Sequence, residues 1–324
     1  WQELCELWAS DLRTHITNKR WVRAKDRLNA LLKQHGISNT FGGKYAAGER
    51  RDTLELVIGQ YGGAKIALGE EGILLYVYTK NTRLELNLRR GLAIQSLAFS
   101  SHEMEPCIGT LPHGHFSSIS LGADYYSGGV VVELPLQRMR FTDLEKVEPR
   151  FSINNDGNIE ISAEIKTPLG IIVKVIEVSV NSEKISLSYA FPEWGEIMGS
   201  VRLGVVTLLN QFSNENTKLA LSNGGKDDEF FDFRGEFDHA KPASSLVSSS
   251  RGLGVTTGKI QIINNERSFS LQWDPSECAV MPMLQRTSIN DEALSRVLFS
   301  MKETDDTAKF PSNIGNFSLT IDAS

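Results

Sequence analysis

Apolar and polar residues alternate along most of the chain from about residue 50 to the C-terminus. The alternation is clearest in residues 53–58, 82–88, 158–165, 184–191 and 259–263, and it returns at 317–321. A period of two places successive side chains on opposite faces, which is typical of strands with one buried face. The pattern therefore predicts a β protein over this part of the chain.

Short turn signals separate the alternating segments. They lie at residues 62–63, 81, 155–157, 181–182 and 264–265. Glycine, asparagine and aspartate at such points favour tight connections between antiparallel strands. From the alternation we expect about fifteen to twenty strands, with no helix of more than two turns after residue 40.

A chain with that many strands needs two packed sheets, because one open sheet would leave long edges and an apolar face unprotected. A β-propeller would require a repeat of about 40–50 residues, and the sequence contains no such repeat. We therefore predict a mainly β fold, a large two-sheet antiparallel β-supersandwich over residues 41–324. Residues 226–239, rich in acidic and aromatic side chains, are predicted to form a long loop within it.

Residues 1–40 follow a different pattern and form the first predicted domain. Their apolar side chains are spaced by three and four, first at Leu4, Leu7, Trp8, Leu12 and Ile16 and then at Trp21, Ala24, Leu28, Leu31 and Leu32. This spacing predicts two short α-helices, and Gly36 is suited to end the second in a left-handed conformation. Because two short helices cannot bury such stripes alone, they must pack on the rest of the chain or on a missing domain. We interpret this helical segment as the end of an upstream region that the chain lacks.

The charge balance excludes some classes of partner. The 324 residues carry 34 basic and 40 acidic side chains, a formal net charge of −6, which argues against nucleic acid. No stretch approaches the roughly 20 consecutive apolar residues of a membrane-spanning helix, so no membrane partner is expected. The 3 cysteines are too few for a disulfide framework. We expect no metal or other cofactor, and the compartment stays open, with the cytoplasm favoured.

Several segments resemble a known family of carbohydrate-active enzymes. The run from Ser10 to Leu12 is similar to the Ser-Asp-Trp helix that follows the catalytic barrel in glycoside hydrolase family 57. The β region resembles the galactose-mutarotase-like supersandwich of those enzymes and of the related α-mannosidase superfamily. The matching segments are residues 113–116, 121–128, 142–144, 203–209, 252–254, 299–300 and 303–307.

The resemblance implies that this chain is the C-terminal β-sandwich region of a glycoside hydrolase or glucanotransferase. The catalytic carboxylates would lie on an upstream catalytic domain of the same polypeptide. The β region would support that domain or bind carbohydrate, an α-glucan or a related glycan. Leu12 stands where the family has Trp, so a sugar-stacking role does not transfer to this position. We do not expect the chain to hydrolyse glycosides alone, and whether it is an enzyme stays open.

A histidine pair offers a second hypothesis. His113 and His115 share one face if the chain is extended there. Together with Asp124 or Glu133 they could bind a metal. With Glu133 as base they could also open a sugar hemiacetal, which would make the chain an autonomous aldose epimerase, a mutarotase-like enzyme. A His pair that only hydrogen-bonds local backbone is the commoner case, so no metal ligand is assigned.

Candidate carbohydrate-binding residues lie at two places in the β region. Asp124, Tyr125 and Tyr126 combine a carboxylate with two phenols, which suits sugar hydroxyls and the apolar face of a pyranose. Trp194 follows a strand end, where an exposed indole can serve as a sugar platform. For each of these residues, packing in the core is an equal or commoner role.

A third candidate patch lies on the first predicted helix. Trp8, Asp11 and His15 are three and four residues apart and therefore share one helix face. The resemblance implies that Asp11 would face the active site of the upstream barrel. A plain helix interface is the commoner use of such residues. A purely structural or oligomerisation module remains the third hypothesis for the whole chain.

Overall fold

The computed structural model describes residues 26–27, 30, 33–34, 55–69, 71–111, 126–225, 227–232, 237–238, 252–289, 292–303 and 310–324. The chain divides into two compact units, Trp1–Glu49 and Arg50–Ser324, and the described strands all belong to the second. The described positions between residues 26 and 34 are helical. The prediction of two leading helices is not confirmed as a whole, and the domain boundary at residue 40 stays a prediction.

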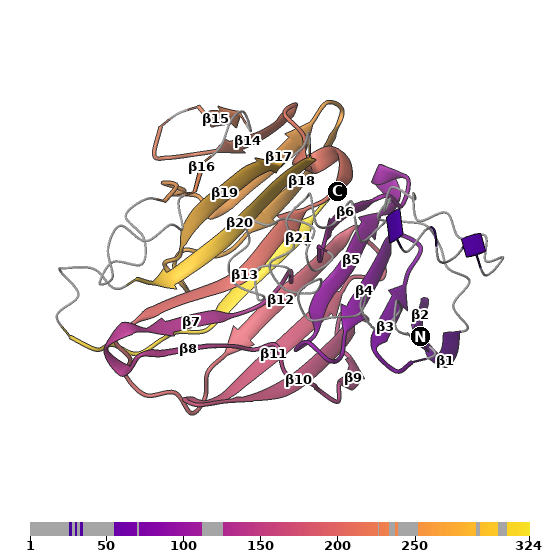
Figure 1. Cartoon of the computed structure of the whole chain (residues 1–324), viewed down its shortest axis with the longest axis horizontal. Helices are drawn as coiled ribbons and strands as arrows, with labels where there is room; N and C mark the ends of the chain where they lie inside the picture. The colour runs from indigo at the N-terminus through magenta and orange to yellow at the C-terminus, as the bar shows by residue number, and fades with distance from the viewer. Residues whose placement is uncertain are drawn as a thin grey trace. The chain divides into compact units, whose positions relative to one another are not determined.

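The second unit is built from two antiparallel sheets, of twelve and nine strands in the described part of the chain (Figure 1). The larger sheet has the order β1 (Glu55–Tyr61), β2 (Ala64–Gly69), β3 (Leu74–Tyr78), β4 (Thr82–Asn87), β5 (Ala93–Phe99), β6 (Pro106–Gly109), β13 (Ser200–Leu208), β20 (Glu292–Lys302), β19 (Met281–Ile289) and β16 (Phe237–Asp238). The same sheet includes β7 (Val131–Leu134), paired with β13, and β8 (Met139–Thr142), paired with β7. The smaller sheet has the order β15 (Glu229–Asp232), β14 (Thr217–Leu221), β17 (Lys259–Asn264), β18 (Arg267–Gln272), β21 (Phe317–Asp322), β12 (Lys184–Ala190), β11 (Gly170–Val178), β10 (Ile159–Thr167) and β9 (Arg150–Ile153). The predicted two-sheet antiparallel architecture is confirmed.

Short 3-10 helices make some of the connections. They are η2 (Ser100–His102), η4 (Pro135–Gln137) and η5 (Asn210–Ser213). No helix in the described ranges is long and apolar enough to span a membrane.

The predicted turns lie where hairpins connect the strands. Gly62 and Gly63 join β1 to β2 with positive φ angles of 52° and 97°, a conformation that glycine adopts without steric cost. In the β9–β10 turn, the Asn154 side chain accepts hydrogen bonds from the backbone N–H groups of Asp156 and Asn158, each 3.0 Å long. The long loop predicted over residues 226–239 is wrong in part, because it contains β15 and β16.

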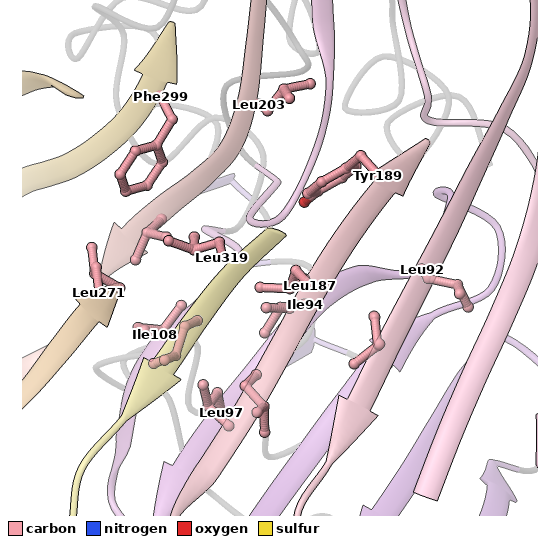
Figure 2. Packing of buried hydrophobic residues seen from close by; sticks show 14 of the residues in the cluster. Leu92, Ile94, Leu97, Ile108, Leu187, Tyr189, Leu203, Leu271, Phe299 and Leu319 are labelled. Atoms are coloured by element: carbon pink, nitrogen blue, oxygen red, sulfur yellow. The ribbon is translucent and has the colours of Figure 1, made fainter. Parts of the chain in front are cut away.

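The main core lies between the two sheets, where the inner faces of the alternating strands meet. Figure 2 shows Leu97 and Ile108 of the larger sheet packed near Leu187 and Leu319 of the smaller sheet. All four side chains are buried. Each such side chain contributes about 1.5–3 kcal/mol when it leaves water, so this face-to-face packing accounts for the sandwich.

A charged pair interrupts this apolar core. Lys174 of β11 lies 3.1 Å from the carboxylate of Asp143, which follows β8, and both side chains are 0% exposed. The Lys174 ammonium also donates a 2.7 Å hydrogen bond to the Gly91 carbonyl. The Asp143 carboxylate accepts a 2.8 Å bond from the backbone N–H of Val130. The pair therefore joins an interior strand of the smaller sheet to three residues that lie next to β5, β7 and β8 of the larger sheet.

Burial acts on both members of the pair. Loss of water lowers the pKa of Lys174 and raises the pKa of Asp143, while their mutual attraction opposes both changes. Gly91 is required beside them, because its φ is +58° and an added Cβ would lie 2.0 Å from the Asp143 carbonyl oxygen. The close backbone approach and the ion pair thus depend on each other.

Removing one member of the pair should destabilise the fold strongly. Lys174→Met leaves a buried carboxylate without its counter-charge, and we expect the free energy of unfolding to fall by about 3–5 kcal/mol. The double variant Lys174→Met with Asp143→Leu should recover most of this loss. Urea denaturation followed by tryptophan fluorescence measures both.

The control is a surface ion pair on the same sheet. Lys218 and Asp232 are 3.7 Å apart and about half exposed, so Lys218→Met should cost less than about 1 kcal/mol. If the double variant were as unstable as the single Lys174→Met variant, the loss of stability would not come from an unpaired Asp143 carboxylate.

A buried histidine forms a second polar link between the sheets. His102 of η2 is 1% exposed, and its Nε2 donates a 3.2 Å hydrogen bond to the Ser268 carbonyl of β18. Its Nδ1 has no hydrogen-bond partner among the described residues. Phe99, Phe212 and Phe269 surround the ring, with centroids 5.2–6.4 Å away. The imidazole is therefore held in an apolar site.

This environment disfavours the charged imidazolium. Loss of water lowers the pKa of His102, the backbone hydrogen bond to Ser268 and the charge of Glu183 oppose that change, and the charge of Arg267 adds to it. The folded protein consequently binds a proton on His102 less readily than the unfolded chain, whose histidine pKa is about 6.5. The free energy of unfolding is therefore highest above about pH 6.5, where His102 is neutral in both states. It decreases as the pH falls below this value and the unfolded chain binds the proton.

We expect the free energy of unfolding to decrease between pH 7 and pH 5, by up to about 1.4 kcal/mol per pH unit for this one proton. His102→Gln keeps a side-chain N–H donor but does not titrate, so its stability should depend less on pH over the same range. Chemical denaturation of both proteins at several pH values compares the slopes. Equal slopes would show that His102 is not the responsible group.

Candidate functional site

A pocket with a volume of about 970 Å³ lies on the outer face of the smaller sheet. Its floor comes from four neighbouring strands in the order β18, β21, β12 and β11, seen side by side in Figure 1. Val173 and Val175 of β11 line it and alternate with the buried Ile172, Lys174 and Ile176. The lining side chains of β11 therefore point away from the core.

The floor changes from apolar to polar across these strands. Val175, Ser188 and Ser318 stand opposite one another in the strand register, and the two serine hydroxyls form a 2.9 Å hydrogen bond. Thr320 and Gln272 form the next pair, between β21 and β18. The floor thus presents hydroxyl and amide groups beside two valine side chains.

The rim is a turn that follows β18. Trp273 begins it and is 7% exposed, because its ring packs on Phe299 of the larger sheet with a centroid distance of 5.3 Å. The Asp274 carbonyl accepts hydrogen bonds from the backbone N–H groups of Glu277 and Cys278, 3.2 and 3.1 Å long. The turn is thereby anchored to the core at one end and closed on itself at the other.

The rim carries two carboxylates. Asp274 accepts hydrogen bonds from the Ser276 hydroxyl and backbone N–H, 2.6 and 2.8 Å long, and these bonds lower the pKa of Asp274. Glu277 lines the pocket beside it. The rim therefore offers carboxylate hydrogen-bond acceptors next to the donors and acceptors of the floor.

This arrangement is suited to a ligand that carries many hydroxyl groups. Hydroxyls can donate to carboxylates and can both donate to and accept from serine, threonine and glutamine side chains. The valines give the floor an apolar part, and mixed lining of this kind is typical of small-molecule sites. Within the described ranges no group of three or more His, Cys, Asp and Glu side chains is placed to hold a metal ion.

Seven of the residues singled out from the sequence lie outside the described part of the chain. They are Trp8, Asp11, His15, His113, His115, Asp124 and Tyr125. Their proposed roles in sugar binding or catalysis stay predictions.

Tyr126 and Trp194 are described, and both are 9% exposed. Tyr126 belongs to a small apolar cluster, with the Arg90 guanidinium 5.7 Å from its ring centroid. Trp194 packs on Phe191 and Phe141, with centroids 4.7 and 5.9 Å away. These contacts give both rings a packing role, so Trp194 is not the exposed platform that its position after a strand suggested, and sugar binding by either residue stays a prediction.

Glu133 lies on β7, and its carboxylate forms an ion pair with Arg140 of the neighbouring strand β8. A substrate proton would have to compete with this guanidinium for the carboxylate oxygens. The described geometry places neither Glu133 nor Tyr126 nor Trp194 in the lining of the outer pocket.

The pocket residues were not found from the sequence, because serine and threonine at outward positions of a strand are typical of any solvated sheet face. One local signal was available. Residues 273–278 follow an alternating segment and combine tryptophan, proline and two acidic side chains, which is a composition often found in functional loops.

Comparison with known proteins places the chain in no family. No family model matches the sequence, and no curated protein matches it. Similar solved structures include a galactose mutarotase-like protein from Clostridium acetobutylicum, at 9% identity and a TM-score of 0.46, over 83% of this chain and 97% of that one.

Two larger enzymes are similar to a comparable degree. A 4-α-glucanotransferase from Thermococcus litoralis matches at 8% identity and a TM-score of 0.44, over 81% of this chain and 39% of that one. An α-N-acetylgalactosaminidase from Bifidobacterium bifidum matches at 6% identity and a TM-score of 0.48, over 76% of this chain and 35% of that one. The chain thus spans less than half the length of these two enzymes. At such values the similarity identifies neither family nor function, and the architecture stands on the sheets themselves.

Cys278 lines the pocket, and the reactivity of its thiol depends on how far that thiol is buried. Partial burial raises the pKa of Cys278 to about 11, so little thiolate is present at pH 7. We expect alkylation of Cys278 by iodoacetamide to accelerate about tenfold per pH unit from pH 7 to pH 10. Peptide mass mapping distinguishes it from Cys107, which is fully buried.

The urea-unfolded chain is the control, because its Cys278 should follow the ordinary thiol pKa and its rate should level off above about pH 8.5. The same levelling in the folded protein would contradict the described environment of the thiol.

Proposed function

We propose that this chain is a carbohydrate-binding accessory region of a glycoside hydrolase or glucanotransferase related to family 57, and that the pocket on the outer face of the smaller sheet takes the glycan. The observation that carries the proposal is the pocket itself, a strand-built floor of hydroxyl and amide groups with two carboxylates on its rim. The resemblance of the Ser10–Leu12 run and of the segments in the β region to family 57 supports the same substrate class.

The chemistry of the floor matches that of a sugar. A pyranose presents hydroxyl groups around its edge and C–H groups on its faces, so it can hydrogen-bond Ser188, Ser318 and Gln272 while it covers Val173 or Val175. An α-glucan is the preferred candidate because of the family resemblance. The upstream catalytic domain that the resemblance implies would act on the glycan held here.

The aldose-epimerase hypothesis has less support. Its proposed base, Glu133, is paired with Arg140, and no described feature favours it as a catalytic group. Polarimetry tests this hypothesis, because acceleration of glucose or galactose mutarotation by the protein would support an epimerase activity.

Isothermal titration calorimetry with maltoheptaose tests the binding proposal on the complete chain. The wild-type protein should bind, and Ser318→Ile should weaken binding at least about tenfold, because the larger aliphatic side chain on β21 fills the floor and removes a hydroxyl while suiting a strand. Ser162→Ile is the matched control. Ser162 lies on β10 of the same sheet, outside the pocket lining, and alternates with buried Ile161 and Ala163, so this variant should bind like the wild type.

Absence of binding by the wild-type chain, or equal binding by both isoleucine variants, would overturn the proposal. Release of reducing ends from soluble starch by the chain alone would overturn its accessory role.

A further inference from the structure

The charges around the pocket are distributed unevenly. Asp274 and Glu277 stand on the rim, and no lysine, arginine or histidine of the described ranges lines the pocket. Lys259 of β17 lies opposite Gln272 in the strand register, but it is exposed and does not belong to the lining, and Lys174 of β11 points into the core. A ligand seated on the floor therefore meets negative charge at the rim.

Asp274 keeps its negative charge near neutral pH. Hydrogen bonds from Ser276 hold the pKa of Asp274 below its usual range, so protonation does not relieve repulsion of an anion near pH 7. A second negative charge within a few ångströms costs free energy even in a partly solvated site, where the effective dielectric constant is about 20. An acidic sugar at this end of the pocket would be repelled.

The dimensions of the floor point to more than one sugar ring. Four adjacent strands contribute to it, and three spacings of about 4.8 Å give a width of about 14 Å. The polarity also changes over that width, from Val173 and Val175 on β11 to Gln272 on β18. A ligand that covers both ends must present its apolar and its polar groups at different places along its length.

From these features we propose that the pocket selects oligosaccharides of several rings that are uncharged or cationic, and that it excludes acidic glycans. This inference rests on the proposed function, because it assumes that the pocket binds carbohydrate. The bound oligosaccharide lies across β11, β12, β21 and β18, and its end above β18 meets the carboxylates of Asp274 and Glu277. Neutral hydroxyls or a sugar ammonium group donate hydrogen bonds to these carboxylates, whereas a uronate carboxylate cannot.

Calorimetric titrations of the complete chain with defined sugars test both parts. Affinity should increase at least about tenfold from maltose to maltoheptaose. Maltotetraose and a glucosamine tetramer should bind at least about tenfold more tightly than a galacturonate tetramer at low salt. In 1 M NaCl the disadvantage of the galacturonate should become smaller, because exposed charges are screened over about 3 Å at that ionic strength.

Variants assign the charge effect to the rim. Asp274→Asn with Glu277→Gln should raise the affinity for galacturonate relative to maltotetraose, measured as the ratio of the two. Glu164→Gln is the matched control, because Glu164 is an exposed carboxylate of β10 in the same sheet and does not line the pocket. It should leave the ratio unchanged.

The outcomes separate the two proposals. Failure of every sugar to bind would overturn the proposed function and this inference with it. Binding of maltose as tight as that of maltoheptaose, or of galacturonate as tight as that of maltotetraose, would overturn the inference while the carbohydrate-binding function stands. An unchanged affinity ratio in the double rim variant would also overturn the role given to the carboxylates.

Discussion

The buried pair of Lys174 and Asp143 is the constraint on which the arrangement of this sandwich depends. Apolar side chains can pack against one another in many ways, but a buried ammonium must find oxygen atoms at hydrogen-bond distance. It finds them in the Asp143 carboxylate and the Gly91 carbonyl, while Val130 supplies an N–H to the same carboxylate. We infer that this directional requirement determines which loops of the larger sheet meet β11.

The same strand that carries the buried lysine also builds the pocket. Because successive residues point to opposite faces, β11 presents Lys174 to the core and Val173 and Val175 to the floor. The neighbouring strand is held in a similar way, since the Tyr189 hydroxyl donates a 2.9 Å hydrogen bond to the Gly128 carbonyl and its ring stacks on Phe317. The floor of the pocket is therefore supported from behind by directional contacts, which makes it a more exact frame for a ligand than a loop would be.

The structure shifts the carbohydrate hypothesis from aromatic platforms to a strand-built surface. The two candidate rings that it describes, Tyr126 and Trp194, are buried among other side chains. The polar groups that meet at one open place are instead serine, threonine and glutamine side chains of the smaller sheet and the acidic turn after β18. Under our proposal the glycan is therefore assigned to these polar groups and not to Tyr126 or Trp194, the rings that residue chemistry alone had suggested.

The sequence by itself determined the local elements, because strand alternation and turn chemistry are properties of neighbouring residues. The alternation around Ile161, Leu187 and Leu319 and the turns at Gly62 and Asn265 all appear where they were expected. Only the tertiary structure decided that β6, β13 and β20 are neighbours, that Lys174 meets Asp143 across 31 residues, and that β18, β21, β12 and β11 form one floor. These facts depend on which strands pair over long sequence separations, and many pairing orders satisfy the same alternation. The sequence around a serine at an outward position does not determine which strands will pair beside it, so the residues that line the pocket are brought together only by the tertiary structure.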